Sequence, residues 1–255
     1  MRTRYVDFDD RHEDLSERMR NAPELAADFQ RKWELSWLYH ENALEGVVYT
    51  GQELALGLDP QPVADATFMG AVREIRNHKA AVGLCRAEAK GKKLKLNVSM
   101  ARKLYEILGT GIEGRSVADW RKDMPIHRSY FHEIAQPPRI QPALQKLFEL
   151  CDTAEFRNAH PIQRATRLHH GFMQIFPFTE NSGRVARLFV NMILFQSGYL
   201  PVIIHATDRQ RYYDSFRHPE SSLRELTMDA IENGLAHAEK FFAHAEKGPA
   251  KKLVR

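Results

Sequence analysis

The segment from 184 to 196, RVARLFVNMILFQ, constrains the fold most, because apolar side chains cover nearly its whole circumference. A surface helix carries its apolar residues in one stripe, whereas a helix that is apolar all round must be enclosed by protein. Gly198 follows as a stop signal, since glycine readily adopts the left-handed conformation that ends helices. The segment therefore predicts a central, buried helix around which the rest of the chain packs.

Most other segments also show apolar residues at helical spacing. The expected helices, with their start and stop signals, are 64–89, 97–109 with Asn97 as N-cap, one beginning at Pro142, one following His160 and Pro161 and ending before Pro177, and about 220–246. A short extended piece at 129–134 in the Pro-rich section predicts a hairpin or flap. No linker divides the chain, so we expect one all-α domain.

Composition bounds the class of protein. Hydrophobic residues make up 43% and charged residues 27% of the sequence, the balance of a soluble globular protein. No apolar run reaches the roughly 18 to 20 residues of a membrane span, and the first residues lack the apolar core of a signal peptide. Cys85 and Cys151 are too few for a disulfide framework. We therefore expect a cytoplasmic protein without a membrane partner; whether it forms a homo-oligomer stays open.

The net charge of +4 is concentrated in two basic stretches, the lysines between 90 and 95 and the tail 247–255. Neither stretch interleaves aromatic residues with the basic ones, as proteins that bind single-stranded nucleic acid do. A solvated turn and a frayed tail account for these charges, so nucleic acid is not the expected partner. A basic face that attracts another anionic ligand remains open.

The polar loop 176–184, FPFTENSGR, lies between two predicted core helices and carries the candidate chemistry. A short polar loop that opens an apolar helix presents backbone N–H groups and the positive end of the helix dipole to an anion. Gly183 lets a ligand approach the backbone closely, and Asn181 tolerates a left-handed conformation. These features predict a phosphate-binding loop.

Two arginines follow in the first turn of the helix. Arg184 and Arg187 are three residues apart and therefore neighbours on one face. Guanidiniums at the start of an apolar helix need anionic partners, which are either acidic side chains of the protein or the phosphate chain of a nucleotide. Glu180 can hold Mg²⁺ against such phosphates, because Mg²⁺ in nucleotide sites uses one or two carboxylates besides phosphate oxygens.

The segment 175–187 resembles the signature of the Fic (Fido) family, His-Pro-Phe-x-Asp/Glu-Gly-Asn-Gly-Arg-x-x-Arg. Its flanks also match, at His160-Pro161, His170-x-Phe172, Asp208-Arg209 and Tyr212-Tyr213, and the resemblance spans about 33–241. It implies a Fic/Fido-type helical domain with a short β-hairpin flap over the site. It further implies that ATP and Mg²⁺ bind there and that AMP is transferred to a Ser, Thr or Tyr hydroxyl of a target protein.

The resemblance assigns a role to each matching residue. Glu180 is expected to be the metal ligand, and Arg187 is expected to contact the terminal phosphate. The anion hole that binds the other phosphates is expected to consist of Asn181, Ser182, Gly183 and Arg184.

The signature departs from the family at two places. The histidine that takes the hydroxyl proton is replaced by Phe176, and Gly-Asn-Gly becomes 181–183, Asn-Ser-Gly. A phenyl ring cannot accept a proton, and the loss of general-base assistance costs about 10²- to 10⁴-fold in rate. The motif puts none of the nearby histidines at the catalytic point, and packed or surface positions are expected for them: His169, His170 and His205.

The segment 35–46 resembles the inhibitory helix of the family, which ends in Ser/Thr-x-x-x-Glu-Gly/Asn. By this resemblance Glu45 pairs with Arg187 and displaces the terminal phosphate of ATP, because a carboxylate and a phosphate compete for one guanidinium. Glu41 occupies the Ser/Thr position. The alternative is an ordinary helix end with Gly46 as its stop.

The resemblance also divides the chain. The expected parts are an N-terminal helical extension (1–32), an inhibitory-helix-like segment (33–59), a Fic core (60–246) and a basic tail (247–255). The interval 129–136 in the flap region is short, so a peptide substrate is expected to dock differently or not at all.

Three functions are compatible with these residues. The first is a divergent Fic-type transferase that binds ATP phosphates and moves AMP or another phosphoryl-containing group to a protein hydroxyl, with weakened or altered catalysis. The second is a catalytically inactive Fic protein that regulates by binding a nucleotide or a partner protein. The third is a nucleic-acid-binding module built on the lysines at 90–95, whose affinity would fall steeply with salt.

Overall fold

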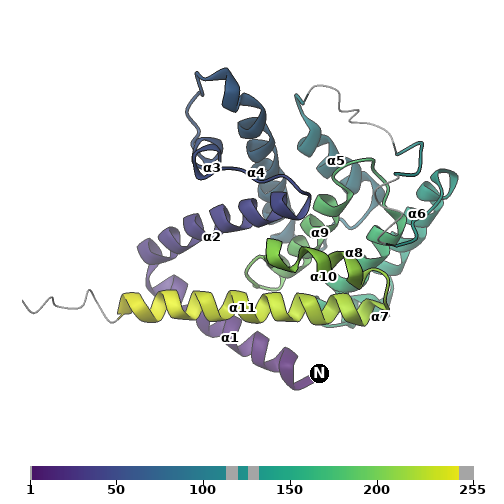
Figure 1. The fold of residues 1–255 in the computed structure, drawn as a ribbon. Helices are drawn as coiled ribbons and strands as arrows, with labels where there is room; N and C mark the ends of the chain where they lie inside the picture. Colours follow the sequence, from purple (N-terminus) through teal and green to yellow (C-terminus); the bar gives the residue numbers. More distant parts are fainter. Residues whose placement is uncertain (1, 113–119, 126–131, 247–255) are drawn as a thin grey trace, which may run out of the picture.

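The computed structural model describes residues 2–112, 120–125 and 132–246, and within these residues every regular element is helical (Figure 1). The α-helices are α1 (Arg2–Asn21), α2 (Pro23–Leu44), α3 (Gly51–Leu58), α4 (Met69–Ala89), α5 (Val98–Gly109), α6 (Ile140–Cys151), α7 (Ala154–Asn158), α8 (Pro161–Ile175), α9 (Ser182–Gln196), α10 (Arg209–Ser215) and α11 (Glu220–Glu246). Short 3-10 turns are formed by Ala66–Phe68, Pro137–Arg139 and Ala206–Asp208. The predicted all-α class is confirmed.

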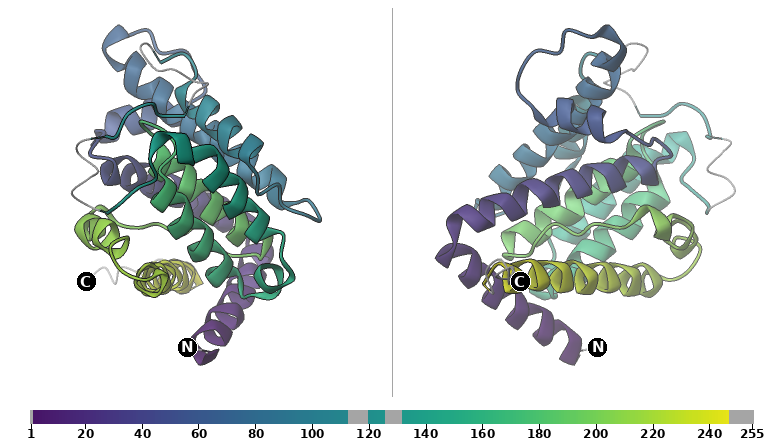
Figure 2. Two further views of the ribbon diagram at one scale, coloured as in Figure 1. Left: turned by 90° about the vertical axis from the view of Figure 1, so that its right-hand side faces the viewer. Right: turned by 60° about the vertical axis from the view of Figure 1, so that its left-hand side comes forward.

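Helix α9 is the centre of the molecule, as its sequence predicts. Every residue from 182 to 194 is buried. The helix packs along α8 and is also contacted by α4 and α5 (Figures 1 and 2). Because its side chains meet protein on all sides, the start of α9 is reached only through the loop that precedes it and the helix ends that surround it.

Local signals set most of the helix ends. Asn97 accepts a hydrogen bond from Met100 N at 2.8 Å and caps α5. His160 caps α8, and its ring nitrogen accepts from Ile162 N. The expected start of α6 at Pro142 is wrong by two residues, because α6 begins at Ile140 and the proline lies in its first turn, where its missing N–H costs nothing. The predicted helix over 64–89 begins with a 3-10 turn and becomes α-helical at Met69.

Helices α1 and α11 lie side by side on one side of the molecule (Figure 2). Their contact includes the ion pairs of Arg4 with Asp229 at 2.8 Å and of Arg11 with Glu239 at 2.7 Å. Helix α2 leads from this side toward the centre and is continuous across the expected division between 32 and 33. The division of the chain into an extension, an inhibitory segment and a core stays a prediction.

The C-terminal end of α2 is held by α10. Arg209 Nε and Tyr213 OH both donate to the carbonyl of Leu44, at 2.9 and 3.1 Å. Gly46 then adopts a φ of 89°, which ends the helix as its glycine predicts. These contacts fix the C-terminal end of α2 against α10.

The expected hairpin at 129–134 falls largely on residues outside those that the structure describes. Its described part, 132–134, forms no strand, and the next residue runs beside the end of α8, where Ala135 N donates to Gln174 O at 3.0 Å. The basic tail 247–255 also lies outside the described residues. Among the helices described, none has the length and apolar character to cross a bilayer.

Candidate functional site

The turn between α8 and α9 contains the two described non-glycine residues with positive φ, Phe176 at 47° and Asn181 at 61°. Asparagine tolerates this region of backbone space, whereas for a bulky residue such as phenylalanine it is uncommon and strained. Phe176 is nevertheless almost completely buried. The surrounding structure must therefore hold this backbone in place.

Arg121 supplies that support, and sequence reasoning did not single it out. Its guanidinium donates to the carbonyls of Phe176 at 2.7 Å, Ile175 at 3.2 Å and Asp123 at 3.1 Å, and also to that of Ala135. Its backbone N–H donates to Pro177 O at 2.9 Å. Burial lowers the pKa of this guanidinium. No local sequence pattern predicts this role of Arg121, because the tertiary fold brings the carbonyl acceptors to it.

Ser182 closes the loop rather than facing a ligand. Its hydroxyl accepts from Phe178 N at 2.8 Å and donates to Phe178 O at 2.9 Å. Phe178 is in turn stacked on Tyr105, with ring centroids 3.9 Å apart. The contribution of Ser182 to an anion site is thus restricted to its backbone N–H.

Arg184 is buried and lies beside the loop. Its Nη2 donates to Asn42 Oδ1 at 2.6 Å and its Nη1 to Asn181 Oδ1 at 3.0 Å, while Glu74 lies 3.8 Å away. Two donors here, Arg184 Nε and Asn181 Nδ2, are buried without an acceptor among the described residues. Unsatisfied buried donors are costly, and an anion at the start of α9 would supply acceptors for them.

Arg187 is held by two carboxylates of α2. Its Nε lies 2.6 Å from both oxygens of Glu41, and its Nη2 lies 2.7 Å from Glu45 Oε1. Its Nη1 donates to Tyr212 OH at 3.0 Å. Burial lowers the pKa of Arg187, but Glu41, Tyr212 and Glu45 outweigh it and raise that pKa well above the usual value. Arg187 therefore stays charged, paired with acidic side chains of its own chain.

Glu41 is the second functional residue that sequence reasoning missed. It is 3% exposed, and burial raises the pKa of its carboxyl while Arg187 opposes that rise. The signal that could have found it is its spacing from Glu45, because residues four apart on a helix share one face. That spacing places both carboxylates of α2 toward the same guanidinium.

Glu45 lies over the start of α9. A Cβ atom built on Gly183 would come within 2.5 Å of Glu45 Oε1 and 2.9 Å of Arg187 Nη1. The N-terminus of a helix attracts anions through its free N–H groups and its dipole. The carboxylate of Glu45 thus lies close to the backbone at the start of α9, and glycine at 183 makes this close approach feasible.

Glu180, the expected metal ligand, is exposed in the loop. The described residues contain no group of three or more His, Cys, Asp or Glu side chains placed to hold a metal ion. A Mg²⁺ ion at Glu180 would therefore need phosphate oxygens and water to complete its shell, which is the usual composition of such sites.

The histidines near the motif are packed against other groups. His169 is buried with its Nε2 2.9 Å from Tyr212 OH, and burial lowers its pKa well below the usual value. His170 Nε2 lies 3.1 Å from His218 O. His205 is stacked on His40 at 4.3 Å. The structure brings none of them to the position of Phe176.

Residues 95–194, which include α5 through most of α9, match the model of the Fic/DOC family. Over 55 residues the chain is 47% identical to the "Protein adenylyltransferase Fic" of Nematostella vectensis, a stretch that covers 22% of this chain and 13% of that protein. A longer match, 25% identical over 185 residues, covers 69% of this chain and 34% of the Drosophila mojavensis protein of the same name. The matches thus span about a third or less of these relatives' length.

Two solved structures share the whole architecture. A Fic-domain-containing signaling protein from Bacteroides thetaiotaomicron has a TM-score of 0.75 and 21% identity, covering 92% of this chain and 97% of that one. Fic-1 of Caenorhabditis elegans, residues 134–508, has a TM-score of 0.74 and 18% identity, covering 97% of this chain and 73% of that one. At this level of identity the likeness establishes the fold.

Proposed function

This chain belongs to the Fic/DOC family, and we propose that it binds the phosphates of ATP at the start of α9, in a site that its own helix α2 holds closed. Mg²⁺ would be held by Glu180 and the phosphates. The bound nucleotide would serve slow transfer of AMP or another phosphoryl-containing group to a hydroxyl of a target protein. The observation that carries the proposal is the carboxylate of Glu45, which lies against Gly183 and 2.7 Å from Arg187.

The residues at the start of α9 fit a phosphate chain. Arg184 Nε and Asn181 Nδ2 are buried donors without an acceptor among the described residues, and both belong to the loop and first turn. Gly183 presents its backbone without a side chain. Phosphate oxygens would satisfy these donors and the free N–H groups of the helix together.

Opening the site requires more than the departure of Glu45. That side chain is 11% exposed at the edge of the site, so it can swing away. Glu41 is 3% exposed and pairs with Arg187 through both oxygens, so it has no comparable exit. A terminal phosphate approaching Arg187 would meet the Glu41 carboxylate, and like charges at such distances repel strongly where water is excluded. We infer that the two carboxylates act as a double closure, of which Glu45 is the releasable part.

The second candidate is a Fic protein that binds nucleotide or a partner without transferring a group, and Phe176 favours it. This side chain is 1% exposed and replaces the proton acceptor of the signature. In the described part of the chain, His169, His170 and His205 all lie elsewhere. Without general-base assistance the transfer would be slower by about 10²- to 10⁴-fold.

Calorimetric titration with ATP and Mg²⁺ tests the binding proposal. Wild-type protein should bind weakly, Glu45→Gly more tightly, and Glu41→Thr/Glu45→Gly most tightly, with at least about a tenfold gain at each step. The control Glu45→Gly/Arg184→Ala should lose the gain. If neither opened variant binds ATP while both unfold cooperatively, the nucleotide proposal is wrong and the scaffold serves protein contacts alone.

A further inference from the structure

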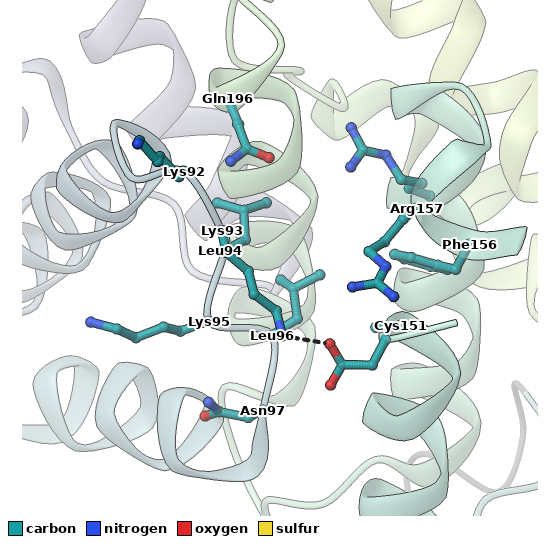
Figure 3. A pocket seen from close by; sticks show the side chains of 12 residues that line it. Lys92, Lys93, Leu94, Lys95, Leu96, Asn97, Cys151, Phe156, Arg157 and Gln196 are labelled. Carbon is teal, nitrogen blue, oxygen red and sulfur yellow. Dashed lines mark ion pairs between the residues drawn. The ribbon is translucent and has the colours of Figure 1, made fainter. Parts of the chain in front are cut away.

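The lysines of the segment between α4 and α5 are exposed, as a solvated turn predicts, but the segment also forms one wall of a cavity. The segment faces the ends of α6, α7 and α8 across this cavity, which has a volume of about 510 Å³. Figure 3 shows Lys92 to Asn97 along one wall of this cavity and Phe156 and Arg157 along the other. Gln196, at the C-terminal end of α9, also lines it. Since a helix rises about 1.5 Å per residue, this cavity lies roughly 20 Å from the start of α9.

The cavity, which we call the basic cavity, is lined by five basic side chains and one acidic side chain: Lys92, Lys93, Lys95, Arg157, Arg164 and Asp152. Lys93 is paired with Asp152 at 2.9 Å, and Lys95 with Glu88 at 3.1 Å. Among the residues that the structure describes, Arg157 forms no ion pair, although its charge, after that of Lys93, helps to lower the pKa of Asp152. Lys93 thus reaches across the cavity to Asp152, while Lys92 and Lys95 point away from the wall that carries Arg157 (Figure 3).

Arg164 is the residue that most requires an anion. It is half-buried, its Nε is buried without an acceptor among the described residues, and its Nη2 reaches only Ser197 Oγ at 3.4 Å. Burial lowers its pKa, and no carboxylate offsets this effect. A guanidinium removed from water without a counter-charge is costly to the folded protein, so a ligand that brings one would be bound favourably.

Part of the remaining lining is apolar and buried. Leu94, Cys151 and Phe156 form part of the wall and are each less than a tenth exposed. The volume falls in the range of roughly 300 to 1,000 Å³ that small-molecule sites occupy. Single-stranded nucleic acid is a poorer match, because its bases stack on exposed aromatic rings and the ring that lines this cavity, Phe156, is buried.

We propose that the basic cavity binds a small organic phosphate. Its phosphate group lies between Arg157 and Arg164, and its organic part lies against Leu94 and Leu96. The site is separate from the start of α9 and does not depend on the proposed nucleotide function.

The test uses phenyl phosphate and inorganic phosphate as probes with the full chain, in calorimetric or competition titrations. Phenyl phosphate should bind at least about fivefold more tightly than inorganic phosphate, because the ring adds apolar contact. Arg157→Ala/Arg164→Ala should weaken its binding at least about tenfold. Two controls should leave it unchanged: Lys240→Ala, which removes an exposed charge on α11, and Arg184→Ala, which disables the start of α9.

A second measurement needs no ligand. Replacing Arg164 with methionine keeps its apolar stem and removes the half-buried charge, so the ligand-free variant should melt at the same or a higher temperature than wild type. A lower melting temperature would show that Arg164 is structural.

The binding titrations have three outcomes that would overturn the proposal. Equal affinity for both probes would indicate an adventitious ion only, and binding that survives the double substitution would place the ligand elsewhere. Tighter binding of an oligonucleotide, with a steep salt dependence, would replace the small-molecule proposal with a nucleic-acid site.

Discussion

Glu41 and Arg187 form a buried ion pair in which both carboxylate oxygens lie 2.6 Å from one nitrogen, Nε. The two side chains are 3% and 4% exposed. Glu45 binds the same guanidinium through a second nitrogen, from the more accessible side. Arg187 thus has two carboxylate partners, and Glu45 is the more exposed of the two.

The stability of the protein should depend more on Glu41 than on Glu45. Removing one partner of a buried ion pair costs on the order of 3 kcal/mol, because it leaves a buried charge poorly compensated. Glu41→Ala should lower the free energy of unfolding by about that amount, whereas Glu45→Ala should cost about 1 kcal/mol because Arg187 keeps Glu41. Urea unfolding of both variants checks the order. The reverse order would contradict the assignment of Glu45 as the releasable part.

Gly183 and Glu45 should be energetically coupled. A Cβ at 183 would come within 2.5 Å of Glu45 Oε1, so Gly183→Ala must push that carboxylate off the helix start. In a double-mutant cycle with Glu45→Ala, the cost of Gly183→Ala should fall by at least about 1 kcal/mol. Additive effects would show that the two residues do not compete for the same space. Gly70→Ala is a matched control, because nothing lies within 4 Å of a Cβ there.

Arg121 should be required for the shape of the loop. Its guanidinium donates to several backbone carbonyls, including that of Phe176 at 2.7 Å, where the backbone is left-handed. Arg121→Ala should cost about 3 kcal/mol of stability, because charged hydrogen bonds are lost and buried carbonyls are left unsatisfied. Hydrogen exchange should increase at residues 176–181 more than in α11. A uniform loss of protection would instead indicate a general role in stability.

His78 should make the fold sensitive to acid. It is buried, and burial followed by Arg184 and Arg187 lowers its pKa from 6.5 to about 3. The unfolded chain gains a proton as the pH falls below 6.5, while the folded chain does not until about 3. The contribution of neutral His78 to stability is therefore fully present above pH 6.5 and is lost as the pH falls from 6.5 to about 3. The loss is up to about 1.4 kcal/mol per pH unit.

Urea unfolding at about pH 7 and about pH 5 measures this slope. His78→Gln should reduce the slope even if it lowers stability at both pH values. Substituting the exposed His237 by glutamine should leave the slope unchanged. An unchanged slope in His78→Gln would assign the acid sensitivity to other groups.

Phe176 decides between a slow transferase and an inactive binding protein. Histidine accommodates a left-handed backbone better than phenylalanine does, so Phe176→His should be tolerated at a φ of 47°. In the Glu45→Gly background it should raise the transfer of label from α-labelled ATP to protein by about 10²-fold or more. Label that appears only with the histidine would support the inactive candidate. Equal labelling with and without it would show that this chain has another base.

Much of the fold follows from local sequence. The all-round apolar character of 184–196 specifies a central helix, and Asn97 and His160 cap the helices that follow them. The turn that precedes α9 is equally local, because asparagine is a residue type that tolerates the positive φ found at Asn181. These helices, caps and turns could be predicted because periodicity and capping involve residues only a few positions apart.

The closure of the site and the basic cavity were decided by the tertiary structure. Glu41 reaches Arg187 across 146 positions of sequence, and Arg121 reaches Phe176 across 55. The lysines at 90–95 are exposed, and only the fold places Arg157 and Arg164 across a cavity from this segment. The sequence by itself determined most of the long helices and which of them is buried. Which charges meet depends on how the helices cross, and crossing is set by the packing of whole helix faces, which no local pattern encodes.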